Sequence, residues 1–98
     1  MAKLIVTYWR DIPAQVVAKQ GRKSAKIMLP ERFQEAIDRA AMRAGKGSSD
    51  AYLEDWRREY SQCSAELQTE VERMAGSLAA SLSEDALETL VKAKGQLP

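Results

Sequence analysis

Residues 29–45 read L-P-E-R-F-Q-E-A-I-D-R-A-A-M-R-A-G and carry nearly every mark of a helix packed on a core. The apolar side chains recur at the spacing of one helical face: Phe33, Ala36, Ile37, Ala40, Ala41 and Ala44. Pro30 suits the first helical position, and Gly45 suits the left-handed conformation that ends a helix. Four of the six inward positions are alanine, so neighbouring segments can approach closely. We therefore expect a helix over residues 30–44 that packs on the segments before and after it.

The size and composition of the chain indicate one folded domain spanning residues 1–98. Of its 98 residues, 45% are hydrophobic and 30% are charged, which is typical of folded proteins. A single cysteine, Cys63, excludes an internal disulfide and favours a reducing compartment. No apolar run approaches the ~20 residues needed to span a bilayer, and the first ten residues do not match a signal peptide. The expected location is the cytoplasm, without a membrane partner.

Three extended segments precede the helix. Residues 3–10 alternate apolar and β-branched side chains on both faces, which predicts a strand covered on both sides. Residues 14–19 form a second short strand after Pro13, and a turn containing Gly21 follows. Residues 25–29 are either a third strand or an extended lead into the helix. The expected fold class is therefore α+β: a small N-terminal antiparallel sheet of two or three strands, covered by the 30–44 helix and followed by two or three further helices.

The second half of the chain reads as helical. After a Gly/Ser-rich loop at residues 45–50, apolar side chains follow at spacings close to a heptad: Leu53, Trp56, Tyr60, Cys63, Leu67, Val71, Met74 and Leu78. Either one helix runs over about residues 50–80, or it breaks near Ser61. A continuous helix over these residues would be longer than so small a core can cover. We therefore expect either a kink or a projecting arm that pairs with a second copy through these apolar residues, the Leu53–Leu78 seam. Ser81 and Ser83 are rival caps for a last helix that folds back.

The residues that usually carry catalysis are scarce. There is no histidine, and one cysteine cannot build a zinc site. No glycine-rich phosphate loop or nucleophile motif is present. The adjacent pairs Glu54/Asp55 and Glu84/Asp85 would point about 100° apart on a helix. We therefore expect neither an autonomous enzyme nor a cofactor or metal, and we interpret Cys63 as a small buried hydrophobe.

The charge is unevenly distributed along the chain. Residues 1–47 hold ten Lys/Arg against four Asp/Glu, and residues 48–98 hold five against ten. One interpretation is a patch for an anion, a phosphate or a nucleic acid; the others are mutual attraction of the two halves or a solvated basic loop. The candidate binding residues are Arg22, Lys23, Lys26, Arg57 and Arg58. A local ion pair such as Glu54–Arg58 is the simpler reading of the two neighbouring arginines.

Several motifs together resemble a known family. They are Y-W-R-D-I-P-A-Q-V at residues 8–16, G-R-K-S-A-K at 21–26, the segment L-P-E-R-F-Q-E-A-I-D-R-A-A at 29–41, S-D-A-Y-L at 49–53 and W-R-R at 56–58. Over roughly residues 1–60 they resemble the small bacterial "virulence factor" domain family, which leaves residues 61–98 as a helical C-terminal extension. The resemblance implies a domain that stands alone or forms part of larger virulence factors. It also implies an association with one-carbon metabolism, namely methylenetetrahydrofolate reductase and corrinoid methyltransferase systems, and it assigns no catalytic residue.

Two functions follow as hypotheses. The first is a non-enzymatic protein-interaction module, an accessory subunit that binds a larger protein partner. The second is a nucleic-acid or phosphate-ligand binder that uses the basic residues of the first half. Self-association through the apolar seam is compatible with either. Binding to nucleic acid that weakens steeply with salt separates the second hypothesis from the first.

Overall fold

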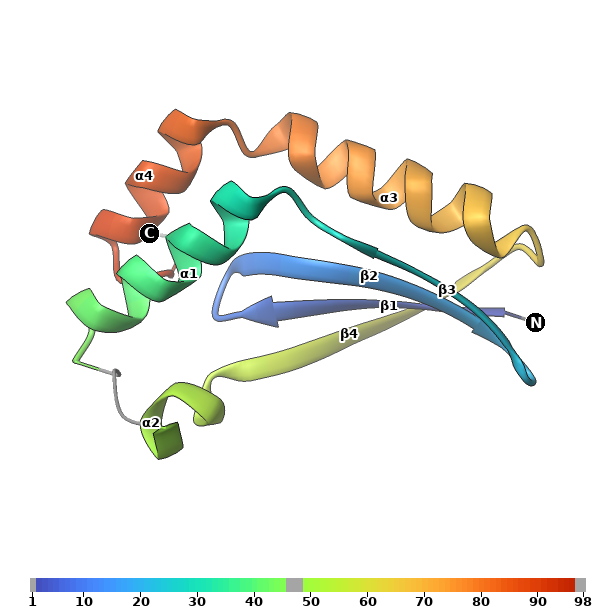
Figure 1. The fold of residues 1–98 in the computed structure, drawn as a ribbon, viewed down its shortest axis with the longest axis horizontal. Helices are drawn as coiled ribbons and strands as arrows, with labels where there is room; N and C mark the ends of the chain where they lie inside the picture. The colour runs from blue at the N-terminus through green and yellow to red at the C-terminus, as the bar shows by residue number, and fades with distance from the viewer. Residues whose placement is uncertain (1, 46–48, 97–98) are drawn as a thin grey trace.

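The computed structural model describes residues 2–45 and 49–96 (Figure 1). Part of the expected loop at residues 45–50 therefore lies outside the described residues. In chain order the elements are β1 (Ala2–Trp9), β2 (Ile12–Gln20), β3 (Lys23–Met28), α1 (Glu31–Arg43), α2 (Ser49–Glu54), β4 (Trp56–Cys63), α3 (Leu67–Ser81) and α4 (Glu84–Lys92). The predicted α+β fold class is confirmed, with one strand more than expected.

The four strands form one antiparallel sheet in the order β3-β2-β1-β4. β1 and β2 are the central strands, and β1 pairs with β4 along its whole length, from Ala2 opposite Cys63 to Trp9 opposite Trp56. A β-bulge interrupts the pairing of β1 with β2 between Thr7 and Tyr8. The expectation that β1 is covered on both faces is wrong: Ala2, Leu4 and Val6 are buried on one face, whereas Lys3 is exposed and Ile5 and Thr7 are only half-buried on the other. β1 obtains its second neighbour from a segment more than forty residues away in the sequence.

The helices α1, α3 and α4 all lie on one side of this sheet (Figure 1). α3 lies across β2 and β3, and α1 packs against β2 and α4. The side chains between these layers form one continuous core. Its largest fully buried members are Trp9, Phe33, Ile12, Ile37, Val16, Val71, Val91 and Pro13. None of these three helices covers the opposite side of the sheet, where alternate residues of the strands such as Lys3 and Lys19 are exposed.

The α1 helix matches its prediction closely. Phe33, Ala36, Ile37, Ala40 and Ala41 are buried on its inner face, as the periodicity predicts. Its start differs by one residue, because Pro30 has extended dihedral angles and is the residue before the helix. Gly45, at φ +73°, follows the helix in the left-handed conformation that was expected there.

The prediction of one or two helices over residues 50–80 is wrong in its middle part. α2 ends at Glu54, residues 56–63 form the edge strand β4, and a helix resumes only at Leu67. The apolar seam is therefore divided among α2, β4 and α3, and the helical arm expected to pair with a second copy does not form. Trp56, Tyr60 and Cys63 fit a helical spacing as well as they fit a strand. Pairing with β1 decides between the two, and the local pattern does not reveal that pairing.

The end of α4 is joined to the β1–β2 turn. The Asp11 amide donates to the Gly95 carbonyl at 2.8 Å, and Arg10 Nη1 donates to the Lys94 carbonyl at 2.8 Å. Gly95, at φ +85°, lies directly against the ring of Trp9. Trp9 also stacks on Tyr52 of α2, with ring centroids 5.9 Å apart, and its indole N–H donates to the Tyr52 carbonyl. Trp9 thus ties α2 and the C-terminal segment to the sheet.

Candidate functional site

The uncovered side of the sheet, which we call the open face, is built by alternate residues of all four strands. Residues directly opposite one another on neighbouring strands share a face, so the register defines its composition. From β3 to β4, the three cross-strand rows are Met28, Gln15, Thr7 and Arg58; Lys26, Val17, Ile5 and Tyr60; and Ser24, Lys19, Lys3 and Gln62. Their partners on the helix side, such as Leu4, Val6 and Val16, are buried.

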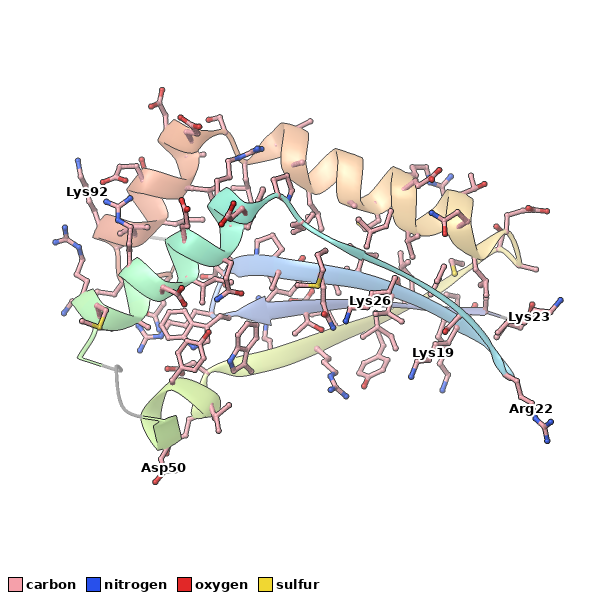
Figure 2. All side chains as sticks on the ribbon, in the orientation of Figure 1. Lys19, Arg22, Lys23, Lys26, Asp50 and Lys92 are labelled. Atoms are coloured by element: carbon pink, nitrogen blue, oxygen red, sulfur yellow. The ribbon has the colours of Figure 1, made fainter. Side chains whose placement is uncertain are left out.

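The open face carries four cations and no carboxylate. Lys3, Lys19, Lys26 and Arg58 are among its twelve positions, and none of the four forms an ion pair with another residue of the described ranges. Figure 2 shows Lys19 on the side of the sheet away from α3. In a chain with 15 basic and 14 acidic residues, this segregation gives the face a positive potential.

Apolar side chains occupy the middle of the same face. Ile5 and Val17 are opposite each other on the two central strands and are half-buried. Tyr60 and Met28, on the two edge strands, are 60% and 56% exposed. An aliphatic centre surrounded by charged and polar groups is the arrangement of protein–protein interfaces, which place apolar residues in the core and polar ones at the rim.

The structure separates the two arginines that the sequence placed together. Arg58 lies on the open face, whereas Arg57 projects to the other side of β4. There Arg57 pairs with Asp11 at 3.3 Å and Glu59 at 3.0 Å, donates to the Arg10 carbonyl, and stacks over the ring of Tyr8. The guanidinium group of Arg57 is therefore paired with groups of the same chain and is not available to a ligand on the open face. Burial, together with the charge of Glu59, raises the pKa of Tyr8 above its usual value.

Arg22 and Lys23 lie at the far tip of the β2–β3 hairpin (Figure 2). They border a shallow depression that continues to the start of α3 and that Glu66 also lines. Of the five candidate residues, therefore, only Lys26 and Arg58 share the open face. A phosphate clamp that combines Arg57 and Arg58 with the hairpin tip does not form in this arrangement.

A second hollow lies between α1 and α4, and side chains of both charge signs line it. Both guanidinium nitrogens Nη1 and Nη2 of Arg39 donate to the Glu88 carboxylate, at 2.8 and 3.0 Å. These hydrogen bonds hold the pKa of Glu88 below its usual value. Acids and bases alternate around this hollow, so it lacks the single sign of charge that distinguishes the open face.

No group of three or more His, Cys, Asp or Glu within residues 2–45 and 49–96 could hold a metal ion. Cys63 ends β4 on the side opposite to Tyr60 and is half-buried. Burial and the nearby Glu70 raise the pKa of its thiol, which disfavours the reactive thiolate. Glu70 is itself buried and accepts a hydrogen bond from the Ser64 amide and another from Arg73.

Sequence reasoning missed most of the open face. Lys3, Ile5, Val17 and Tyr60 belong to it, yet none was a candidate site residue. The available signal was the alternation along residues 3–10 and 14–19, which assigns odd-numbered positions to one face. That alternation cannot say which face the helices cover, nor that β4 adds Arg58 and Tyr60 to it.

Comparison with known proteins identifies one relationship. The model of a family described as "Virulence factor" matches residues 7–91, which reaches from β1 into α4 and past the resemblance over residues 1–60. No curated protein and no solved structure matches the chain. None of the described helices is long and apolar enough to cross a membrane.

Proposed function

This chain belongs to the virulence factor family, and we propose that it works as a non-enzymatic interaction module, an accessory subunit that binds a larger protein through its open face. The family resemblance suggests the one-carbon and methyl-transfer enzymes as the class in which to look for that partner. The observation that carries the proposal is the open face itself, with its aliphatic centre, cationic surround and absence of acids.

The composition of the face favours binding over chemistry. Its twelve positions include no carboxylate and no thiol, and the chain has no histidine. General acid–base or nucleophilic catalysis there would need a group that titrates or is activated near neutral pH. Lysine, arginine, glutamine and tyrosine side chains around Ile5 and Val17 can instead supply hydrogen bonds, charge and apolar contact to a docked surface.

A nucleic acid is the second candidate, because four cations without an ion pair among the described residues and an exposed tyrosine share one sheet face. Proteins that bind single strands on a sheet stack successive bases on aromatic rings and lead the phosphates along a basic groove. Here the two central positions of the three rows are Ile5 and Val17, and the aromatic ring within these rows, Tyr60, lies on the edge strand β4. Aliphatic side chains fit a protein surface better than they fit a stack of bases.

Site-specific photo-crosslinking tests the proposal. A benzophenone amino acid is placed at Tyr60 of the full chain, which is then expressed in its native cells and irradiated. The matched control carries the same group at Met42, a 73% exposed residue of α1. We expect a defined protein adduct from position 60 and none from position 42. Equal adducts at both positions, or an adduct that only nuclease removes, would contradict the proposal.

A salt titration with a fluorescent single-stranded oligonucleotide tests the second candidate separately. Binding that neutralises four phosphates would weaken with a log–log slope of roughly −3 for a single strand. A slope of this size, reduced by about 0.7 in the Lys19→Gln variant because one of four phosphate contacts is removed, would favour the nucleic acid. Absence of binding at moderate salt leaves the protein partner.

A further inference from the structure

The open face has a small hollow near its middle. A cavity of about 120 Å³ is lined by Ile5, Thr7, Gln15, Val17, Lys19 and Arg58, and we call it the sheet hollow. Pockets for cofactors and drug-sized ligands run to ~300–1,000 Å³. The sheet hollow is therefore the size of one side chain or one small anion.

The strand register explains why the hollow forms there. Ile5 and Val17 lie opposite each other on the central strands and are short, so they make its floor. Successive residues on one face of a strand are about 6.8 Å apart, twice the rise per residue. Lys19 lies two positions along β2 from Val17, and Arg58 reaches in from β4 in the row on the other side of that floor. Two long cationic side chains thus flank a short apolar pair.

The charges around the hollow are all of one sign. Lys19 and Arg58 form no ion pair with any residue of the described ranges, and no acid is among the lining residues. The Thr7 hydroxyl and the Gln15 amide offer two further hydrogen-bond donors at the row that includes Arg58. The hollow therefore has the donors to bind an anionic group but has no anion of its own.

We propose that the sheet hollow seats one acidic side chain, a glutamate or an aspartate, of the protein partner. The carboxylate lies between Lys19 and Arg58, and its methylene groups rest on Ile5 and Val17. This inference depends on the proposed function, since it names the feature of the partner that the open face recognises. A buried anchor of this kind would be a hot spot, because two cations match its charge beside an aliphatic floor.

A phosphate group is the competing anion, and the floor of the hollow argues against it. A phosphate ester presents oxygen atoms on almost every side, so two of its faces would meet the aliphatic groups of Ile5 and Val17. An acidic side chain presents oxygens at one end and methylenes at the other, which matches a hollow with cations at its edges and an apolar floor.

Nuclear magnetic resonance titration of the full chain tests the inference with defined probes. The first probe is a capped Leu-Glu-Leu tripeptide, its matched control is the capped Leu-Gln-Leu tripeptide, and inorganic phosphate is the third, all at equal ionic strength. We expect saturable shifts of the Thr7 and Val17 amides with the glutamate peptide. The glutamine peptide should bind at least roughly tenfold more weakly, because the neutral amide loses the charge-assisted contacts with both Lys19 and Arg58.

Variants locate the binding on the molecule. Lys19→Gln and Arg58→Gln should each weaken the glutamate peptide by a similar factor, whereas Lys23→Gln, which removes an equal charge at the hairpin tip, should leave it unchanged. Equal binding of the two peptides overturns the inference. Tighter binding of phosphate than of the glutamate peptide also overturns it, and would direct attention to a nucleic acid or a phosphorylated partner.

The crosslinking experiment keeps this inference separate from the proposed function. If the adduct from position 60 persists undiminished in the Lys19→Gln and Arg58→Gln variants, the open face still binds a protein but the hollow is not its anchor. If no adduct forms at all, the proposed function fails and the inference fails with it.

Discussion

The two faces of the sheet alternate along the same four strands and yet carry different chemistry. On the helix side, Leu4, Val6, Val16 and Ala18 are buried beneath α1 and α3. On the open face, the positions between them hold lysine, threonine and glutamine around one aliphatic pair. The helix side accounts for the stability of the fold, since it contains the core. The open face contributes little to that core, so its residues can change without loss of the fold and can serve binding. Substitutions on the helix side should therefore lower stability, and substitutions on the open face should affect binding.

The largest effect is expected from two neighbouring valines of β2. Val16 is fully buried, and Val17 is half-buried on the open face. Val16→Asp places an unpaired carboxylate in the core, so the free energy of unfolding should fall by about 4 kcal/mol or more. Val17→Asp should cost about 1 kcal/mol or less, the span of strand propensity. Urea unfolding followed by circular dichroism measures both.

The pair also tests the sheet hollow. Val17→Asp would place a carboxylate beside Lys19 and Arg58, and this internal anion should block the glutamate peptide while the protein stays folded. If Val16→Asp yields no folded protein, Val16→Ala replaces it, with an expected loss of roughly 2 kcal/mol. Similar losses at positions 16 and 17 would show that the open face is covered in solution.

The next largest effect concerns Gly95, which holds the C-terminal segment against Trp9. A Cβ added there would lie 2.8 Å from Trp9 Cζ3, and the backbone has φ +85°. Gly95→Ala should therefore lower the free energy of unfolding by about 3 kcal/mol, from backbone strain together with the clash. Gly21→Ala is the control, because that residue also has a positive φ but has nothing within 4 Å. Its cost should be only about 1 kcal/mol. Equal losses in the two variants would exclude a role for the Trp9 contact.

A smaller effect distinguishes the two arginines of β4. Arg57→Ala removes the ion pairs with Asp11 and Glu59 and the contact with Tyr8, which should cost about 1 kcal/mol. Arg58→Ala removes no ion pair among the described residues, so the free energy of unfolding should change by less than about 0.5 kcal/mol. Binding of the glutamate peptide should be weakened by Arg58→Ala and left nearly unchanged by Arg57→Ala. If Arg57→Ala weakens binding of the glutamate peptide and Arg58→Ala does not, the assignment of Arg57 to stability and Arg58 to binding is wrong.

The smallest effect is the pH dependence contributed by Glu88. Its pKa is lowered in the folded state by hydrogen bonds from Arg39, below the usual 4.5. A lowered folded-state pKa stabilises the protein above the unfolded-state pKa, and this contribution disappears as the pH falls through the folded-state pKa. The difference in unfolding free energy between the wild type and Glu88→Gln should therefore be present at pH 7 and shrink below about pH 4. A difference that grows on acidification would contradict the Arg39–Glu88 pair as its cause.

Much of the fold could be predicted because its signals are local. The Phe33 to Ala41 periodicity and Gly45 predict α1 without any tertiary information. Ser83, one of two rival caps, accepts the hydrogen bond from the Ala86 amide at the start of α4. The β1–β2–β3 meander follows from alternation and from the turn at Gly21, although β2 begins at Ile12 and includes Pro13, which was expected to precede it. Each of these features depends on residues within a few positions of one another.

The strand β4 could not be predicted in the same way, because its pairing is long-range. Every residue of β4 from Arg57 to Gln62 is exposed, so no buried side chain marks a face. A helical spacing of Trp56, Tyr60 and Cys63 therefore fitted the local sequence equally well. Only hydrogen bonds to β1 make this segment a strand, and β1 lies more than forty residues earlier in the chain.

The candidate site also has one part that the sequence determines and another that depends on the tertiary structure. The residue types of the open face, its lysines, arginines and missing acids, are a property of the sequence. Their assembly is a property of the tertiary structure, because strands from both halves of the chain must pair before Lys19 and Arg58 flank one hollow. Side-chain alternation is imposed locally by the backbone, whereas register between distant strands and the choice of face that the helices cover depend on the packing of the whole core.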